Sequence, residues 1–248
     1  MTTRLRPDLD FSSFPESDGE PMAETIENMT QMIDLMFALR GLLAARGRTR
    51  VAVGGNQFLY YNPHNGREHV SPDVYVALDV PPGDRPTWKT WEEGKCPDVV
   101  FEITSPSTQN EDVGPKRDLY ARLGAREYYI YDPQDLLRPR FQGFVSRAGW
   151  LEPLPYLPNG GIVSPLLETE LRPVGVYLRA IDPATGTPLL TPEEARRAYA
   201  ALRGDYQAVE ERLSAAEQRA AQAEAELEAL RATLSRQQGR ESTDADEA

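Results

Sequence analysis

The sequence predicts an α/β fold in which a mixed central sheet is flanked by helices and followed by a long C-terminal helix. Residues 22–46 carry apolar side chains at helical spacing, and short runs of strand character follow between residues 51 and 181. After Pro192 the composition changes to Ala, Glu, Arg, Leu and Gln, with one Gly and no Pro up to residue 238. The order of one helix, three strands, a helix and further strands is typical of a mixed sheet with helices packed on it.

Composition places the chain among globular proteins. Its 248 residues, 40% of them hydrophobic, are enough for one sizeable core and an appendage. The first residues contain no apolar stretch of the signal-peptide kind, and no run approaches the roughly 20 apolar residues that cross a bilayer, so we expect no membrane association. The single cysteine, Cys96, excludes an internal disulfide and a cysteine-based zinc site, and it fits a cytoplasmic protein.

Both parts of the chain carry a net negative charge. The net charge is −12, to which residues 192–248 contribute −5 and residues 1–191 contribute −7. This balance argues against non-specific coating of nucleic acid, because Lys and Arg carry phosphate binding. It leaves open an enzyme with a locally basic groove and acids that hold a metal. The two histidines, His64 and His69, fall in an expected hairpin tip, which argues against a histidine-based site.

Four segments are expected along the chain. Residues 1–20 mix Pro, Ser, Asp and Phe without a period and predict an irregular lead-in, and residues 21–191 form the main domain. Its first helix covers residues 22–46 and stops at Gly47. Strand character is expected over 49–63, followed by a hairpin tip at 63–66, then over 68–80 and, after a loop over 81–96, over 97–104. A short helix over 115–123, a strand over 126–133 and short strands over 138–181 that extend the sheet in antiparallel fashion are expected next.

Residues 192–238 predict a coiled coil. Apolar or small residues alternate at spacings of four and three, which makes a heptad seam. An acidic, disordered tail is expected over residues 239–248. The seam consists of Ala195, Tyr199, Leu202, Tyr206, Val209, Leu213, Ala216, Ala220, Ala223, Leu227, Leu230 and Leu234.

Charges beside the seam favour a parallel pair of helices. With Tyr206 and Leu213 at position a, residues at positions g and e of two chains face each other. Self-association through residues 192–238 is therefore the preferred interpretation, and a lone solvated helix stabilised by side-chain pairs is the alternative. Three facing pairs have opposite sign (Arg212 with Glu217, Arg219 with Glu224, Glu226 with Arg231) and one has like sign (Asp205 with Glu210).

One acid stands inside an apolar strand. The stretch PDVVFEITSPST, residues 97–108, surrounds Glu102 with apolar residues, and an ionised Glu buried there costs several kcal/mol unless it is paired. A second carboxylate on a neighbouring strand would let the two share one Mg²⁺. Asp98 is about 13 Å from Glu102 along the same strand, which is too far, at ~3.3 Å per residue. Asp73, at the start of the strand VYVAL, is not excluded by distance, because its strand can run beside that of Glu102.

A lysine on the following helix completes the candidate site. Hydrolysis at a metal needs a group that orients water and neutralises charge developing on a phosphate, a task that suits lysine. Two residues after Glu102 the chain has Thr104, and the next lysine downstream is Lys116 in the first turn of the expected helix. Tyr120 lies four residues further on, so it is expected on the same helix face.

These segments resemble a known family. SPDVYVAL, PDVVFEITSPST, EDVGPKRDLYARLGAREYYIYDP and LLTPEEARRAYA are similar to the bacterial restriction-endonuclease-like proteins of the PD-(D/E)XK nuclease superfamily, over about residues 17–200. The resemblance implies an α/β/α core with a mixed sheet and Mg²⁺-dependent hydrolysis of DNA. Asp73 and Glu102 match the motif acids. Thr104 stands where the superfamily has its lysine, and Lys116 is the position that matches instead.

The resemblance also suggests accessory residues. Superfamily members often add an acid from the first helix, for which Glu24 and Glu27 are candidates; the alternative is that both are ordinary acids of a first helical turn. The hypothesis is an endonuclease in which Asp73, Glu102 and the Ile103 carbonyl hold Mg²⁺, with Mn²⁺ as a substitute, and Lys116 assists the attacking water. The competing hypothesis is an inactive nuclease fold that serves binding or assembly through its coiled coil.

Overall fold

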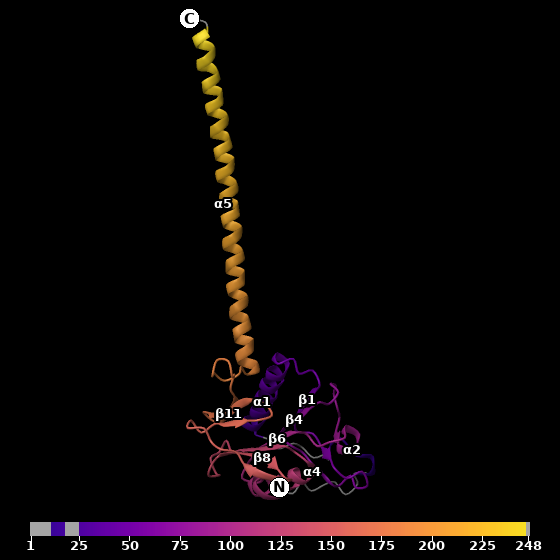
Figure 1. Ribbon diagram of the computed structural model, residues 1–248. Helices are drawn as coiled ribbons and strands as arrows, with labels where there is room; N and C mark the ends of the chain where they lie inside the picture. Colours follow the sequence, from indigo (N-terminus) through magenta and orange to yellow (C-terminus); the bar gives the residue numbers. More distant parts are fainter. Residues whose placement is uncertain (1–10, 18–24, 247–248) are drawn as a thin grey trace. The chain divides into compact units, whose positions relative to one another are not determined.

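The computed structural model describes residues 11–17 and 25–246. Its contacts divide the chain into two units, Met1–Pro192 and Glu193–Ala248. The first unit contains a mixed sheet with helices on both faces, and the second is one helix (Figure 1). The sequence prediction of a mixed α/β fold with a long C-terminal helix is confirmed. Among the described helices, none is long and apolar enough to cross a membrane.

The central sheet has six strands in the order β1-β4-β6-β7-β8-β9. Strands β6 and β7 run parallel, and every other neighbouring pair is antiparallel. Both faces of the middle strands are covered, which explains their near-continuous apolar sequences. The strands are β1 (Val51–Gly54), β4 (Val74–Leu78), β6 (Val99–Ile103), β7 (Glu127–Tyr131), β8 (Phe141–Arg147) and β9 (Trp150–Pro153).

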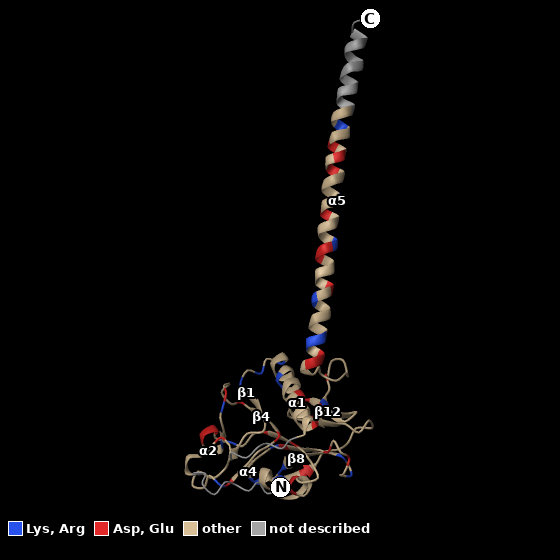
Figure 2. Cartoon of the chain, turned by 180° about the vertical axis from the view of Figure 1, so that it is seen from behind, with Lys and Arg blue, Asp and Glu red and all other residues tan. Residues whose placement is uncertain are grey.

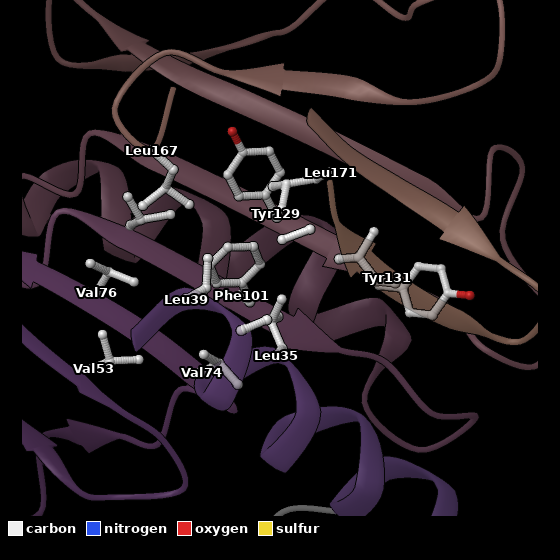
Figure 3. Close-up of a cluster of buried hydrophobic side chains, with 14 of the residues drawn as sticks. Leu35, Leu39, Val53, Val74, Val76, Phe101, Tyr129, Tyr131, Leu167 and Leu171 are labelled. Atoms are coloured by element: carbon white, nitrogen blue, oxygen red, sulfur yellow. The ribbon is translucent and has the colours of Figure 1, made fainter. Parts of the chain in front are cut away.

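Helix α1 (Ile26–Ala45) covers one face of the sheet. It begins where the side chain of Thr25 accepts a hydrogen bond from the Asn28 amide, and it ends at Ala45, two residues before Gly47, whose φ of 69° suits glycine. Figure 3 shows Leu35 and Leu39 of this helix beside Phe101 of the sheet. The expected helix started at residue 22, but residues 22–24 lie outside the described part of the chain.

Two small sheets complete the domain. The first contains β2 (Leu59–Tyr60), β3 (His69–Val70) and β5 (Trp88–Lys89), and the second contains β10 (Ile162–Ser164), β11 (Thr169–Val174) and β12 (Tyr177–Ala180). The prediction that residues 138–181 extend the central sheet holds for β8 and β9 and is wrong for β10 to β12, which pair only with one another among the described strands.

The second small sheet packs on the α1 side of the central sheet instead of joining its edge. Leu167 and Leu171 insert into the same core as Phe101 (Figure 3). A buried acid, Glu127 of β7, also fixes this arrangement, because its carboxylate accepts hydrogen bonds from the Ser164 hydroxyl at 2.5 Å and the Leu166 amide at 2.7 Å. Burial raises the pKa of Glu127 above its usual range.

The helical segment after β6 starts earlier than the sequence predicted. Helix α3 (Gln109–Glu111) leads into a π-helical turn (Asp112–Lys116) and then into α4 (Arg117–Leu123). Pro115 was expected in the first turn, where a missing N–H costs nothing; it lies inside the helical segment instead, and the π turn accommodates it. The expected end at Gly124 is correct, since Gly124 is left-handed with φ 90°.

Three short elements lie elsewhere in the domain, namely a 3₁₀ turn (Phe11–Ser13), β5 and α2 (Thr90–Glu93).

Helix α5 (Pro192–Asp246) contains 55 residues. It continues through residues 239–246, which the sequence analysis assigned to a disordered acidic tail. From Tyr199 to Leu230 the residues of the heptad seam are exposed, with exposed fractions of 64% at Tyr206 and 58% at Leu213.

Candidate metal centre

Glu102 lies at the end of β6 on the face of the sheet opposite α1. Alternation along the strand sends Phe101 and Ile103 into the α1 core, so Glu102 points toward α4. The side chain is 1% exposed and has two partners. Lys116 Nζ donates to Oε2 at 2.9 Å, and the Tyr120 hydroxyl donates to Oε1 at 3.1 Å. The cation that the buried acid required is therefore present in the chain itself.

Asp73 faces Glu102 from the neighbouring strand. Because Val74 pairs with Phe101 in antiparallel register, the next position places Asp73 opposite Glu102, on the same face of the sheet. Asp73 Oδ2 accepts a hydrogen bond from the Ile103 amide at 2.6 Å. The two carboxylates and the Glu102–Ile103 peptide thus converge at one end of β4 and β6.

Lys116 lies between two buried acids. Its Nζ is 2.9 Å from Glu102 Oε2 and 2.8 Å from Asp112 Oδ1. Asp112 is the first residue of the π turn, and Lys116 is the last. Burial alone would lower the pKa of Lys116, but the carboxylates of Glu102, Asp112 and Asp73 raise it above its ordinary value. The two carboxylate contacts favour the protonated ammonium form, which donates hydrogen bonds and supplies positive charge at this place.

Asp112 was missed by the sequence analysis. It is 1% exposed, and the Tyr128 hydroxyl donates to its backbone carbonyl at 2.8 Å. Its spacing of four residues from Lys116 is the signal that pointed to it. That signal was overlooked because the helix was expected to begin at Pro115, which would have left Asp112 in a turn.

The remaining candidate residues occupy different places. Tyr120 is fully buried, so it fixes the Glu102 carboxylate and does not line an open pocket. Glu27 is exposed in the first turn of α1 and belongs to no cluster of three acids within residues 11–17 and 25–246. Glu24 lies outside the described residues. Asp98, which strand geometry excluded, lies at the other end of β6, where it accepts hydrogen bonds from the Leu78 amide at 2.7 Å and Lys95 Nζ at 2.6 Å.

The donor set fits a hard divalent cation. Mg²⁺ prefers oxygen ligands and is usually held by one or two carboxylates together with water and substrate phosphate. Asp73 and Glu102 provide two carboxylates and Ile103 a carbonyl, while no ready-made group of three metal-binding side chains exists in the part of the chain that the structure describes. Burial raises the pKa of Glu102 well above its usual range. The Lys116 ammonium opposes this rise, and the negative charges of Asp73 and Asp112 add to it. Three acids around one ammonium leave surplus negative charge that a cation would neutralise.

A close backbone contact positions Asp73. A Cβ atom at Gly55 would lie 2.1 Å from the Asp73 carbonyl oxygen, and the Asn56 amide donates to the Pro72 carbonyl at 2.8 Å. The loop after β1 therefore packs directly on the chain that enters β4. Only glycine permits this approach.

We expect Gly55→Ala to displace Asp73 and to weaken Mn²⁺ binding by about tenfold or more, the scale typical when a support of a metal ligand is removed. Calorimetric titration with Mn²⁺ measures the effect. The matched control is Gly41→Ala on α1, where an added Cβ meets nothing within 4 Å. Equal affinity in the two variants would show that the contact at Gly55 does not position a ligand.

Comparison with known proteins shows which family the chain belongs to. The Uma2 model, described as "Putative restriction endonuclease", matches residues 14–173, which is well over half of the chain. The chain belongs to the Uma2 family. The resemblance to restriction-endonuclease-like proteins is thereby confirmed, and the protein is nuclease-like. The Uma2 match includes Asp73, Glu102 and Lys116 and ends before α5 begins.

Other comparisons add little to the Uma2 assignment. A solved structure described as "a putative nuclease belonging to DUF820" from Anabaena variabilis is 15% identical, with a TM-score of 0.43, and the alignment covers 60% of this chain and 77% of that one. No curated protein matches the sequence.

Proposed function

We propose that the chain is a Mg²⁺-dependent endonuclease that hydrolyses phosphodiester bonds in DNA. Asp73, Glu102 and the Ile103 carbonyl would hold the cation, for which Mn²⁺ is a substitute. The observation that carries the proposal is the convergence of Asp73 and Glu102 across β4 and β6, with the Lys116 ammonium 2.9 Å from Glu102. Membership of a family described as "Putative restriction endonuclease" supports the reaction class.

The chain's own residues have separate tasks in this scheme. A bound divalent cation supplies Lewis acidity and lowers the pKa of its bound water. Lys116, kept protonated by the three surrounding acids, donates a hydrogen bond to the attacking water or to the phosphate and offsets the charge that develops there. The Tyr120 hydroxyl holds one oxygen of Glu102, which leaves lone pairs on both oxygens for a metal.

Cleavage of supercoiled plasmid tests the proposed activity. We expect nicked or linear product with Mg²⁺ or Mn²⁺ and none with EDTA. A wild-type protein that binds neither ion in calorimetric titration and leaves DNA intact would favour the alternative, an inactive nuclease fold that works in binding or assembly. The feature that favours this alternative is the long exposed seam of α5.

We also propose that two copies of α5 associate in parallel through the heptad seam. Leu213 lies at the seam and is 58% exposed in the single chain, while its neighbour Ser214 lies outside the seam. A buried charge in a coiled-coil seam is costly, so Leu213→Asp should shift the protein from dimer to monomer at micromolar concentration. Sedimentation equilibrium measures the mass, with Ser214→Asp as the matched control. If wild type, Leu213→Asp and Ser214→Asp have the same mass, the seam does not mediate association.

A further inference from the structure

A fully buried hydroxyl, that of Thr104, follows the last residue of β6. Within residues 11–17 and 25–246, three buried side-chain atoms make no hydrogen bond, and they are Thr104 Oγ1, Asp112 Oδ1 and Arg140 Nε. Asp112 Oδ1 still contacts the Lys116 ammonium at 2.8 Å, and Arg140 donates through another nitrogen to the Gly175 carbonyl at 3.2 Å. The described residues offer the Thr104 hydroxyl no comparable contact, so it is the group that most needs a partner.

Strand geometry places this hydroxyl on the face of the sheet that carries Glu102. The Thr104 amide donates to the Tyr131 carbonyl at 2.8 Å, so the pairing of β6 with β7 continues one residue beyond Ile103. Side chains two residues apart in an extended chain point to the same face and stand about 6.6 Å apart along the chain. Thr104 therefore points toward the α4 side, as Glu102 does, and it lies next to the Ile103 carbonyl that the proposed function assigns to the cation.

The charged groups of the site do not supply what a hydroxyl supplies. The Lys116 ammonium has three donors and no acceptor, so it cannot accept a hydrogen bond from water. The Glu102 carboxylate already accepts from Lys116 and Tyr120, and in the proposed function its other lone pairs face the cation. A threonine hydroxyl has one donor and two acceptor lone pairs, and the branch at Cβ restricts its rotation. Thr104 is therefore suited to fix the orientation of a water molecule.

We infer that the Thr104 hydroxyl accepts a hydrogen bond from the water that attacks the phosphate and thereby fixes its orientation. This inference rests on the proposed nuclease function. Mg²⁺ keeps several of its waters in protein sites, so a partner for the hydroxyl arrives with the cation. Thr104 orients this water and takes no proton from it, while the Lys116 ammonium offsets charge on the phosphate.

Thermal unfolding in EDTA tests whether the hydroxyl lacks a partner in the metal-free protein. Thr104→Val replaces the hydroxyl by a methyl group of similar size and changes none of the charges in the part of the domain that contains α4, where Figure 2 shows both basic and acidic positions. Removal of an unsatisfied buried hydroxyl should raise the unfolding temperature.

The matched control for this measurement is Thr169→Val. Thr169 is also buried, but its hydroxyl donates to the Ile181 carbonyl, so its removal should lower the unfolding temperature. The two substitutions delete the same atoms and should shift stability in opposite directions. An unfolding temperature of Thr104→Val below that of the wild type would overturn the inference, because the hydroxyl would then have a partner without the cation.

Calorimetric titration with Mn²⁺ tests the link to the cation without DNA. Thr104→Val should bind Mn²⁺ about tenfold more weakly than the wild type, the scale typical when an outer support of a metal site is removed. Thr104→Ser keeps the hydroxyl and should restore most of the affinity, and Thr169→Val should bind Mn²⁺ like the wild type. Equal Mn²⁺ affinity of Thr104→Val and the wild type would contradict a hydroxyl that holds water beside the cation.

Plasmid cleavage tests the orientation of the attacking water. Thr104→Val should lower kcat by about 10- to 100-fold and leave the KM for DNA unchanged, because misplacement of an attacking group slows the chemical step. Thr104→Ser should recover most of the kcat, which a structural role of the Thr104 methyl group would not explain. A raised KM with an unchanged kcat would overturn the inference.

The same measurements separate this inference from the proposed function. If the wild type cuts DNA and Thr104→Val keeps both its kcat and its Mn²⁺ affinity, the inference fails and the nuclease function stands. If the wild type binds Mn²⁺ with an affinity that depends on Thr104 but cuts no DNA, the nuclease function fails and Thr104 remains a support of the cation site. If the wild type binds no Mn²⁺, both fail.

Discussion

Glu102→Gln should reduce metal-dependent DNA cleavage by about 1,000-fold and leave the fold intact. The amide has the shape of the carboxylate but carries no charge, so it is a poor ligand for Mg²⁺. The Tyr120 hydroxyl can still donate to the amide oxygen, and Lys116 retains its contact with Asp112 at 2.8 Å. Because the Lys116 ammonium keeps a carboxylate partner, removal of the Glu102 charge leaves no buried cation unpaired, and the fold should be retained.

Rates of plasmid nicking, with circular dichroism as the check on folding, measure this effect. Glu111→Gln is the matched control, since Glu111 is an exposed acid next to Asp112 in the same helical segment. A Glu102→Gln protein that cuts DNA as fast as Glu111→Gln would remove Glu102 from the reaction.

Lys116→Met should separate catalysis from metal binding. Loss of the ammonium should lower the cleavage rate by about 100-fold or more, because charge that develops on the phosphate is no longer offset. Binding of Mn²⁺ should become tighter, since a positive charge beside the acids disappears. Glu102 and Asp112, each 1% exposed, would be left without their cation, so the protein without metal should lose about 3 kcal/mol of stability.

Thermal unfolding with and without Mn²⁺ checks the second half of this prediction. The metal should restore more stability to Lys116→Met than to wild type, because it replaces the missing cation. Lys116→Arg, which keeps the charge, should be intermediate in rate, and Lys89→Met, at the exposed pair with Glu92, should behave as wild type. Weaker Mn²⁺ binding by Lys116→Met would contradict the assigned role and make the lysine a structural support.

The residues of the site could be predicted from the sequence more readily than their arrangement in the folded domain. Glu102 was identified because an acid in a buried strand demands a partner, and distance along the strand ruled out Asp98, which the structure places at the opposite end of β6. The pairing of Val74 with Phe101, which brings Asp73 opposite Glu102, is a property of the folded sheet and cannot be read from either strand alone.

The predictions that failed depended on packing between distant segments. Strands β10 to β12 have the alternation of a sheet extension, but Glu127 and Leu171 fix them against the face of the central sheet. Pro115 has the signature of a helix start, yet a π turn carries the helix across it and aligns Asp112 with Lys116. Helix rules describe local preference alone, and they do not foresee a π turn that accommodates proline inside a helical segment.

The most direct test of the central claim is the anomalous diffraction of a crystal soaked in Mn²⁺. We expect a peak bound by Asp73, Glu102 and the Ile103 carbonyl, at the ~2.1 Å distances typical of Mg²⁺ sites, with Lys116 still within hydrogen-bonding distance of the site. A Mn²⁺ peak that involves only one of the two carboxylates, or the absence of any peak between β4 and β6 at saturating Mn²⁺, would contradict the proposed metal centre.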